Sequence, residues 1–322
     1  MDGDPVPEPR EKSRDGAAKQ AQAIAQLRTG QSDLSDELLH ALSSIRTEPL
    51  QQAQGAMQTF DVHERFVLLE RMTQAEEQSH LIDFAPFFLA ALNDDDATVR
   101  GLAASGLAIH EAPDSIAPLI ALAQSDPDES VRGEAVIALA PAALRAEYGQ
   151  LPGRLRDTLV EALRAIANDV AEEPLVRGSA LASVAVVDEP WVRDLIFDMY
   201  EEGDSALRVG AIEAMGRTSD TYWLPTIENA MTLVDEEERI AAAGAAGEIE
   251  DEDAIPAIAE LLEDESTEVV VAAIEALGEI GGPEAVEQLG HVATHPDTAV
   301  RAAVESAIEA AAFSDDPMGM SR

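Results

Sequence analysis

The chain has 322 residues, of which 63 are acidic and 21 basic, with no cysteine and 4% aromatic residues. The missing cysteines exclude a disulfide framework, cysteine-ligated zinc, iron–sulfur clusters and thiol catalysis. A net charge of −42 repels phosphate backbones and anionic lipid headgroups, which disfavours nucleic-acid and membrane-surface roles. Alanine supplies much of the hydrophobic content, and this predicts many small cores in place of one large core.

The chain opens with the polar segment MDGDPVPEPREKSRDG, and we expect residues 1–16 to be a disordered tail. The segment lacks the apolar stretch of a secretory signal, and the sequence holds no run of 18 apolar residues. We therefore expect a soluble, cytoplasmic protein without membrane contact.

Residues 17–79 are predicted to form a helical N-terminal capping region that contains a degenerate repeat. Within it, EPLQQAQGAMQTF (48–60) and VHERFVLLERM (62–72) carry apolar residues at helical spacing. The register of this repeat stays open between Gln52 and Arg65.

From residue 80 to residue 313, an arginine followed by an Ala/Gly-rich apolar run recurs. We call its position the arginine slot. The slot is occupied in order by Arg100, Arg132, Arg177, Arg208, Arg239, Val270 and Arg301. Five of the six intervals are 31 or 32 residues long, and such a period is typical of stacked helical repeats. Most copies hold a proline upstream and an acidic turn just before the slot, which predicts a helix, a short turn and a second helix.

The second helix of each copy carries a narrow apolar stripe, with alanine three residues after the slot in six copies and valine in the last. Two short helices cannot bury such a stripe alone, so neighbouring pairs must stack. The prediction is an all-α solenoid with about seven clear copies, followed by a disordered tail at 314–322. Gly216, Gly247 and Gly278, one place beyond the stripe, fit helix C-termini.

One interval of 45 residues carries an insertion. We interpret it as a lengthened first helix at about 153–170, preceded by an ordered loop.

The repeat pattern D-x-x-x-x-V-R-x-x-A-x-x-A-L-G-x-I resembles the short HEAT-like repeat, of the subtype also found in phycobilisome lyases. The resemblance covers roughly residues 80–312 and implies an α-solenoid. It is specific for the fold and weak for function, since this family serves mostly as scaffolds and adaptors. The acidic composition, with two lysines, resembles that of cytoplasmic proteins from salt-accumulating halophiles.

The arginine ladder offers guanidinium groups that suit anions. It lies beside aspartates four residues before the slot, so we interpret it as structural bonding between repeats. The arginines are Arg100, Arg132, Arg177, Arg208, Arg239 and Arg301, and the aspartates are Asp96, Asp128, Asp204 and Asp297.

Candidate chemistry is sparse in the sequence. Glu287, His291 and His295 would share a face of a continuous helix, as metal ligands do, but Pro296 disfavours helix at that point. The sequence has no Gly-x-Ser-x-Gly elbow and no lysine beyond residue 19, which removes several nucleophile and phosphate-binding motifs. We therefore predict no catalytic residue, no metal ligand and no cofactor.

Trp191 and Trp223, 32 residues apart, are expected near each other on adjacent first helices, as core or as an exposed aromatic site.

The resemblance implies binding through the concave face made by the second helices. The candidate protein-binding residues are Leu102, Ser105, Glu134, Ile137, Ser179, Glu213, Glu275 and Glu279. We expect a non-catalytic scaffold or adaptor for a protein partner, for example in a signalling, motility or regulatory complex. The alternatives are a bilin-lyase-like enzyme or enzyme subunit, and a HEAT-like DNA-binding or repair protein. The partner, the pathway and the oligomeric state stay open, with a monomer or a heteromeric complex favoured.

Overall fold

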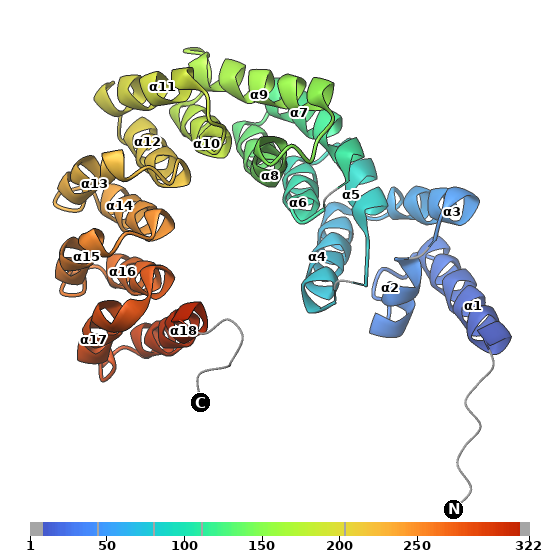
Figure 1. Ribbon diagram of the computed structural model, residues 1–322. Helices are drawn as coiled ribbons and strands as arrows, with labels where there is room; N and C mark the ends of the chain where they lie inside the picture. Colours follow the sequence, from blue (N-terminus) through green and yellow to red (C-terminus); the bar gives the residue numbers. More distant parts are fainter. Residues whose placement is uncertain (1–8, 44, 80, 111, 203, 316–322) are drawn as a thin grey trace, which may run out of the picture. The chain divides into compact units, whose positions relative to one another are not determined.

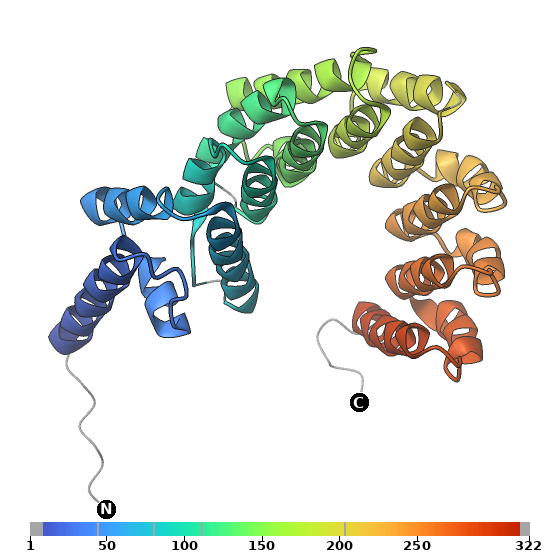
Figure 2. The ribbon, with the colours of Figure 1, turned by 180° about the vertical axis from the view of Figure 1, so that it is seen from behind.

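The computed structural model describes residues 9–43, 45–79, 81–110, 112–202 and 204–315. These residues form eighteen α-helices and three short 3-10 helices without a strand, so the predicted all-α class is confirmed (Figures 1 and 2). The chain packs as two compact units, unit 1 of residues 1–138 and unit 2 of residues 139–322.

Unit 1 contains three helix pairs after two leading helices. Helix α4 packs on α6, and α3 on α5, as neighbouring repeats do. Its helices are α1 (Pro9–Arg28), α2 (Asp36–Leu42), α3 (Thr47–Met57), α4 (Val62–Gln78), α5 (Ala85–Ala91), α6 (Ala97–Leu107), η1 (Pro113–Ser115), α7 (Ile116–Ser125) and the first part of α8 (Glu129–Glu147), which runs across the division between the units.

Unit 2 is a regular stack in which the second helices α10, α12, α14, α16 and α18 each pack on the next. Its remaining helices are α9 (Gly153–Asn168), α10 (Pro174–Val184), α11 (Pro190–Glu201), α12 (Ser205–Arg217), η2 (Thr221–Trp223), α13 (Leu224–Ala230), α14 (Glu236–Ile249), η3 (Glu252–Ala254), α15 (Ile255–Leu261), α16 (Thr267–Ile280), α17 (Gly282–Val292) and α18 (Thr298–Asp315). The predicted stacking of helix pairs is therefore present.

Acidic and hydroxyl side chains mark where second helices begin. The Asp96 carboxylate accepts the backbone N–H groups of Thr98 and Val99, and Asp204 caps α12 in the same way. Ser266 caps α16 through its hydroxyl. These bonds satisfy N–H groups that have no partner within the helix, so the acidic turns fix the helix starts.

Three glycines lie near the C-termini of the second helices, as predicted, but they are helical residues and not the caps. Gly216, Gly247 and Gly278 lie in the last turns of α12, α14 and α16. A Cβ atom on Gly216 would lie 2.6 Å from the Cα of Ala245, which no real Cβ contact allows. Glycine is therefore required there because the next second helix approaches closely.

The ends of the chain differ from the predicted tails, since helix covers residues 9–16 in α1 and residues 314–315 in α18. The physical reason for α1 is burial: Ala23 and Leu27 are fully buried, and Lys19 pairs with Asp15 and, at 2.9 Å, with Glu37. The remainder of both predicted tails, 1–8 and 316–322, lies outside the described residues.

The insertion is shared between two helices. Helix α9 covers most of the predicted lengthened helix, but α8 is also long, at 19 residues, with Pro141 inside it. The predicted loop is therefore limited to residues 148–152. The packing also divides the chain at 138/139 and not at 79/80, because α3 and α4 stack on the following repeat.

Candidate functional site

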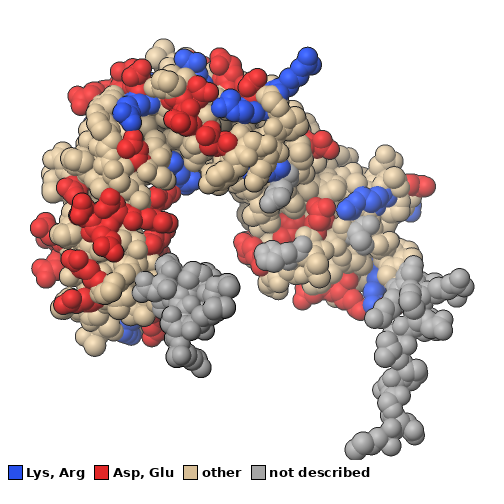
Figure 3. Space-filling view, in the orientation of Figure 1, with Lys and Arg blue, Asp and Glu red and all other residues tan. Residues whose placement is uncertain are grey.

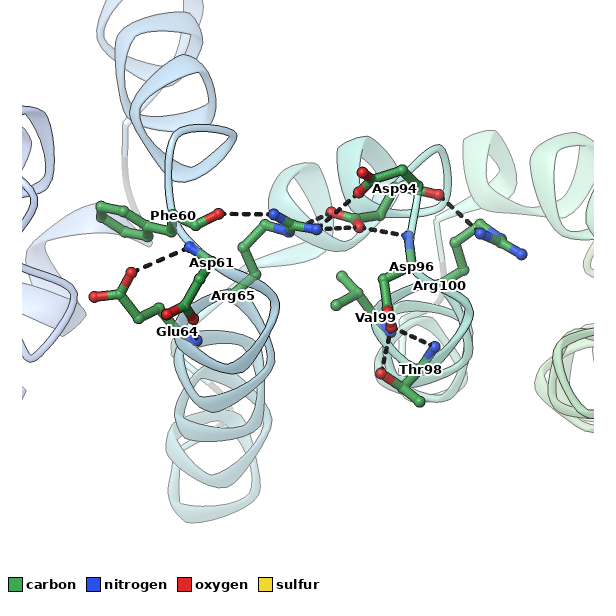
Figure 4. Close-up of polar contacts among 10 residues, drawn as sticks. Phe60, Asp61, Glu64, Arg65, Asp94, Asp96, Thr98, Val99 and Arg100 are labelled. Carbon is green, nitrogen blue, oxygen red and sulfur yellow. Dashed lines mark hydrogen bonds and ion pairs between the residues drawn. The ribbon is translucent and has the colours of Figure 1, made fainter.

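Arg65 is the centre of the polar contacts in unit 1, as Figure 4 shows. Its Nη1 donates to the backbone oxygen of Phe60 at 2.7 Å, and its Nη2 donates to Asp94 and Asp95, at 2.8 Å each. Its Nε lies 2.8 Å from the second Asp94 oxygen. Arg65 is 9% exposed, so its charge is buried and is neutralised by these two carboxylates.

Arg65 thus takes the slot of the degenerate repeat, and Gln52 does not. The same geometry recurs at Arg100, which bonds the backbone oxygen of Asp94 at 2.9 Å and the Asp126 carboxylate at 2.7 and 2.8 Å. Asp94 therefore links Arg65 of one repeat to Arg100 of the next. The signal in the sequence was Asp61, four residues before Arg65, which caps α4 with a capping box.

Unit 2 repeats the arrangement with other acids. Arg239 bonds both oxygens of Asp264 at 2.8 and 3.0 Å, and this bonding lowers the pKa of the Asp264 carboxyl. The further acid partners are Glu202 for Arg177 and Glu238 for Arg208. The aspartates four residues before the slot instead cap their own helices, at Asp96, Asp128, Asp204 and Asp297. The guanidinium groups of Arg100, Arg177, Arg208 and Arg239 are thus occupied by acids of the next repeat, and Arg301 bonds backbone carbonyls of the turn before its own helix, which leaves little capacity for a ligand anion.

A cavity of about 300 Å³ adjoins Arg65. Its apolar walls come from α3, α4, α5 and α6, and its polar rim includes carboxylate and amide groups. The lining includes the apolar side chains of Met57, Leu69, Phe87 and Val99 and the amides of Gln58 and Asn93. Because the guanidinium already pairs with two aspartates, the cavity suits an apolar side chain better than an anion.

The exposed face of the second helices contains positions two, five and nine after the slot. In unit 1 this face is partly apolar: Ile137 is 54% exposed, and Ile109, just after α6, is 57% exposed. Leu102 is half-buried. Ser105 is exposed and donates to Glu134 at 2.7 Å, which joins α6 to α8. Ile109 is not among the predicted residues, although Glu279, which also lies nine residues after its slot, is among them.

In unit 2 the same face is acidic. Glu213, Glu275 and Glu279 are exposed, and Ser179 is half-buried. Glu248, which was not among the predicted residues, is exposed as well. Loss of hydration against the protein raises the pKa of Glu213 and of Glu248, and Arg217 opposes the rise at both.

The exposed glutamates of this face continue into α16. The pKa of Glu279 is raised first by lost hydration and then by the negative charge of neighbouring glutamates, including Glu248. Arg217 pairs with Glu248 at 2.9 Å. We call Glu213, Glu248, Glu275 and Glu279 the acidic row. Figure 3 shows that acidic side chains outnumber basic ones over the repeats of unit 2 at the left of the view.

The remaining candidates are structural. Trp223 is 1% exposed and packs on Phe197, with ring centroids 4.8 Å apart, whereas Trp191 lies beneath the Arg164 guanidinium. Each of the two tryptophans thus has a partner of its own. Phe197 and Tyr222 are partly exposed.

The histidines of unit 2 do not share a helix face. Helix α17 ends at Val292, so His291 lies in its last turn and His295 lies beyond it. His295 Nδ1 instead accepts the backbone N–H of Asp297 at 3.2 Å.

The stacked helix pairs and the ladder between their turns define the chain as an α-solenoid. A family model described as HEAT repeats matches residues 74–140 and 224–309. The chain is similar to the complex of CpcE and CpcF of phycocyanin lyase from Nostoc sp. PCC7120, at 18% identity, 83% coverage of this chain, 96% of that chain and a TM-score of 0.52. Residues 74–140 and 224–309 are therefore HEAT-like repeats, and the fold of the chain is an α-solenoid.

Two further structures align over most of this chain with lower scores. Yeast importin-beta (Kap95p) matches at 14% identity, with 94% of this chain and 47% of that chain covered and a TM-score of 0.49. Human deoxyhypusine hydroxylase in complex with glycerol matches at 17% identity, with coverages of 93% and 99% and a TM-score of 0.38. The search of curated proteins finds no match.

Among the described residues, none of the helices combines the length and the apolar character needed to cross a bilayer.

Proposed function

We propose that this chain is a non-catalytic scaffold that binds a protein partner through the exposed face of its second helices. The observation that carries the proposal is the contrast between the guanidinium ladder, whose arginines bond acids and backbone carbonyls of the solenoid, and the second-helix face, where Ile109, Ile137 and the acidic row face solvent. Isoleucines exposed by more than half on a helical repeat are suited to a hydrophobic anchor contact.

The chemistry of the partner follows from the side chains that each unit exposes on its second-helix face. Unit 1 offers apolar side chains rimmed by Ser105 and Glu134, which suits an aliphatic or aromatic anchor. Unit 2 offers glutamates whose ionised forms are disfavoured by lost hydration, and at Glu279 also by one another, so a cationic side chain placed among them relieves that cost. The partner therefore carries an apolar segment and a basic segment.

The test is a binding experiment with an identified partner. Partners are captured by the full chain at high salt, identified, purified, and titrated against it by calorimetry. Ile109→Asp with Ile137→Asp is expected to weaken binding at least tenfold, since buried apolar anchors dominate interface energies. The matched control is Val234→Asp, because Val234 is 99% exposed in the turn before α14 and away from the second-helix face.

The proposal fails if the isoleucine variant binds as tightly as the unchanged chain, or if the purified chain alone turns over a substrate. A visible absorption band on incubation with a bilin would support the lyase-like alternative instead.

A further inference from the structure

Three side chains from distant parts of unit 1 meet near the end of α4. Glu76 lies in the last turn of α4, Asp83 lies in the connection to α5, and His110 follows α6. A ligand atom from each lies within 4.8 Å of the other two. Glu76 and His110 are separated by 34 positions in the sequence, which explains why no sequence pattern joined them.

The Glu76 carboxylate is buried, with 4% of the residue exposed. One of its oxygens accepts the backbone N–H of Phe84, and the other lies 3.2 Å from His110 Nε2. The His110 ring is held against Phe88, with centroids 6.0 Å apart. Two of the three groups are thus fixed by packing, while Asp83, whose side chain is half exposed, accepts the backbone N–H of Ala85 at 3.0 Å.

The charge of this cluster is unbalanced when the imidazole is neutral, because two carboxylates then contribute −2. Arg46 pairs with Asp83 at 3.4 Å, but both side chains are half exposed, and this pair does not reach buried Glu76. A divalent cation between the groups neutralises both carboxylates. Burial of an unpaired carboxylate is costly, so such an ion has a large electrostatic gain.

The distance between Glu76 and His110 fits two ligands of one transition-metal ion, while the Asp83 carboxylate lies 3.8 Å from the other ring nitrogen, Nδ1, and must turn toward the ion. Two ligands of a tetrahedral zinc ion at about 2.0–2.1 Å are roughly 3.3 Å apart, and Glu76 Oε2 and His110 Nε2 are 3.2 Å apart. One imidazole with two carboxylates is a donor set for Zn²⁺ and similar first-row ions, while Mg²⁺ and Ca²⁺ prefer oxygen ligands alone.

We propose that Glu76, Asp83 and His110 bind one divalent transition-metal ion, with water completing its shell. The ion would join the end of α4, the connection before α5 and the segment after α6, and so fix two neighbouring repeats of unit 1. This site adjoins Ile109 of the second-helix face, but it does not depend on the proposed scaffold function.

The experiment uses the full chain, treated with chelator and then held in molar KCl with excess Mg²⁺ to suppress binding by the acidic surface. Zn²⁺ is titrated by calorimetry, and Co²⁺ is added as a spectroscopic probe. We expect one Zn²⁺ per chain and a visible Co²⁺ absorption band from an ordered low-symmetry site. His110→Gln and Asp83→Asn are each expected to weaken Zn²⁺ binding by at least about tenfold.

The matched control is His291→Gln, which removes a histidine of unit 2 and should leave binding unchanged. Circular dichroism of each variant checks folding, and Asp83→Asn decides the test if His110→Gln unfolds, because Asp83 is half exposed. The proposal is overturned if no Zn²⁺ binds under Mg²⁺ competition, or if Asp83→Asn and a folded His110→Gln bind as the unchanged chain does. In those cases hydrogen bonds alone hold the three side chains together.

Discussion

Glycine leaves room for different neighbours in the two units. In unit 1, a Cβ atom on Gly106 would lie 2.6 Å from a ring carbon of Phe88, so this glycine makes room for a buried side chain. In unit 2, a Cβ on Gly216 would meet the Cα of Ala245 at the same distance, so that glycine makes room for the neighbouring backbone.

The spacing of the repeats follows from this difference. Unit 2 places its slots 31 residues apart from Arg177 to Arg301, because helices in backbone contact tolerate no change of register. In unit 1 the interval from Arg65 to Arg100 is 35 residues, since 100 − 65 = 35, and large side chains fill the space. Phe84, Phe87 and Phe88 are all at most 2% exposed. Side-chain packing thus permits irregular repeats, and backbone packing enforces regular ones.

The largest effect is expected from the buried arginine of unit 1. Arg65→Met leaves Asp94, whose side chain is 11% exposed, without its counter-ion, and breaking a buried pair costs about 3–5 kcal/mol. In unit 2, Arg301 bonds three backbone carbonyls within the described residues, so Arg301→Met is expected to cost about 1 kcal/mol. Urea unfolding followed by circular dichroism measures both, and equal losses would refute the contrast.

The two glycines provide the direct test of the comparison. Gly106→Ala and Gly216→Ala should each destabilise the fold by roughly 1–3 kcal/mol through overpacking, although alanine favours helix. Phe88→Leu should recover a large part of the loss in Gly106→Ala, because a smaller side chain removes the clash. Ala245→Gly should recover less of the loss in Gly216→Ala, since the Cα and the oxygen of residue 245 remain close. Double-mutant cycles measure the two coupling energies.

Two other glycines serve as controls in the opposite direction. Gly55 in α3 and Gly244 in α14 are helical and have open space where a Cβ would lie. Alanine at either position should stabilise its unit by up to about 1 kcal/mol, because glycine is a poor helix former. A loss of stability at Gly244 in the same unfolding assay would show that unit 2 is crowded beyond its helix contacts.

The sequence predicted the architecture because the arginine slot and the alanine stripe repeat locally. It also selected the second-helix face, including Ile137 and Glu213, from their position in the repeat. It could not identify the neighbours of Gly216 or the meeting of Glu76 with His110, since both depend on which distant segments stack. The acid partners of the arginines were missed for the same reason: Asp126 lies 26 residues after Arg100, in the next repeat's turn.

The smallest expected effect is a difference in pH dependence between the acidic row and the turn aspartates. The raised pKa values of Glu213, Glu248 and Glu279 mean that their ionised forms destabilise the folded state at neutral pH. As pH falls from 7 through these raised pKa values, protonation relieves that cost and stability rises. Replacing all three by glutamine should flatten this rise in unfolding free energy measured against pH.

The pKa shift of Asp264 has the opposite sign, so this residue supplies the control. Its pKa is lowered by the Arg239 bonds, so its contribution is present above the ordinary value of 3.8 and is lost as pH falls through the lowered pKa. Asp264→Asn should therefore reduce stability at neutral pH and weaken the loss at acid pH, while it keeps the rise caused by the acidic row. If the triple glutamine variant keeps that rise as well, the acidic row is not its source, and the charge of the remaining surface must supply it.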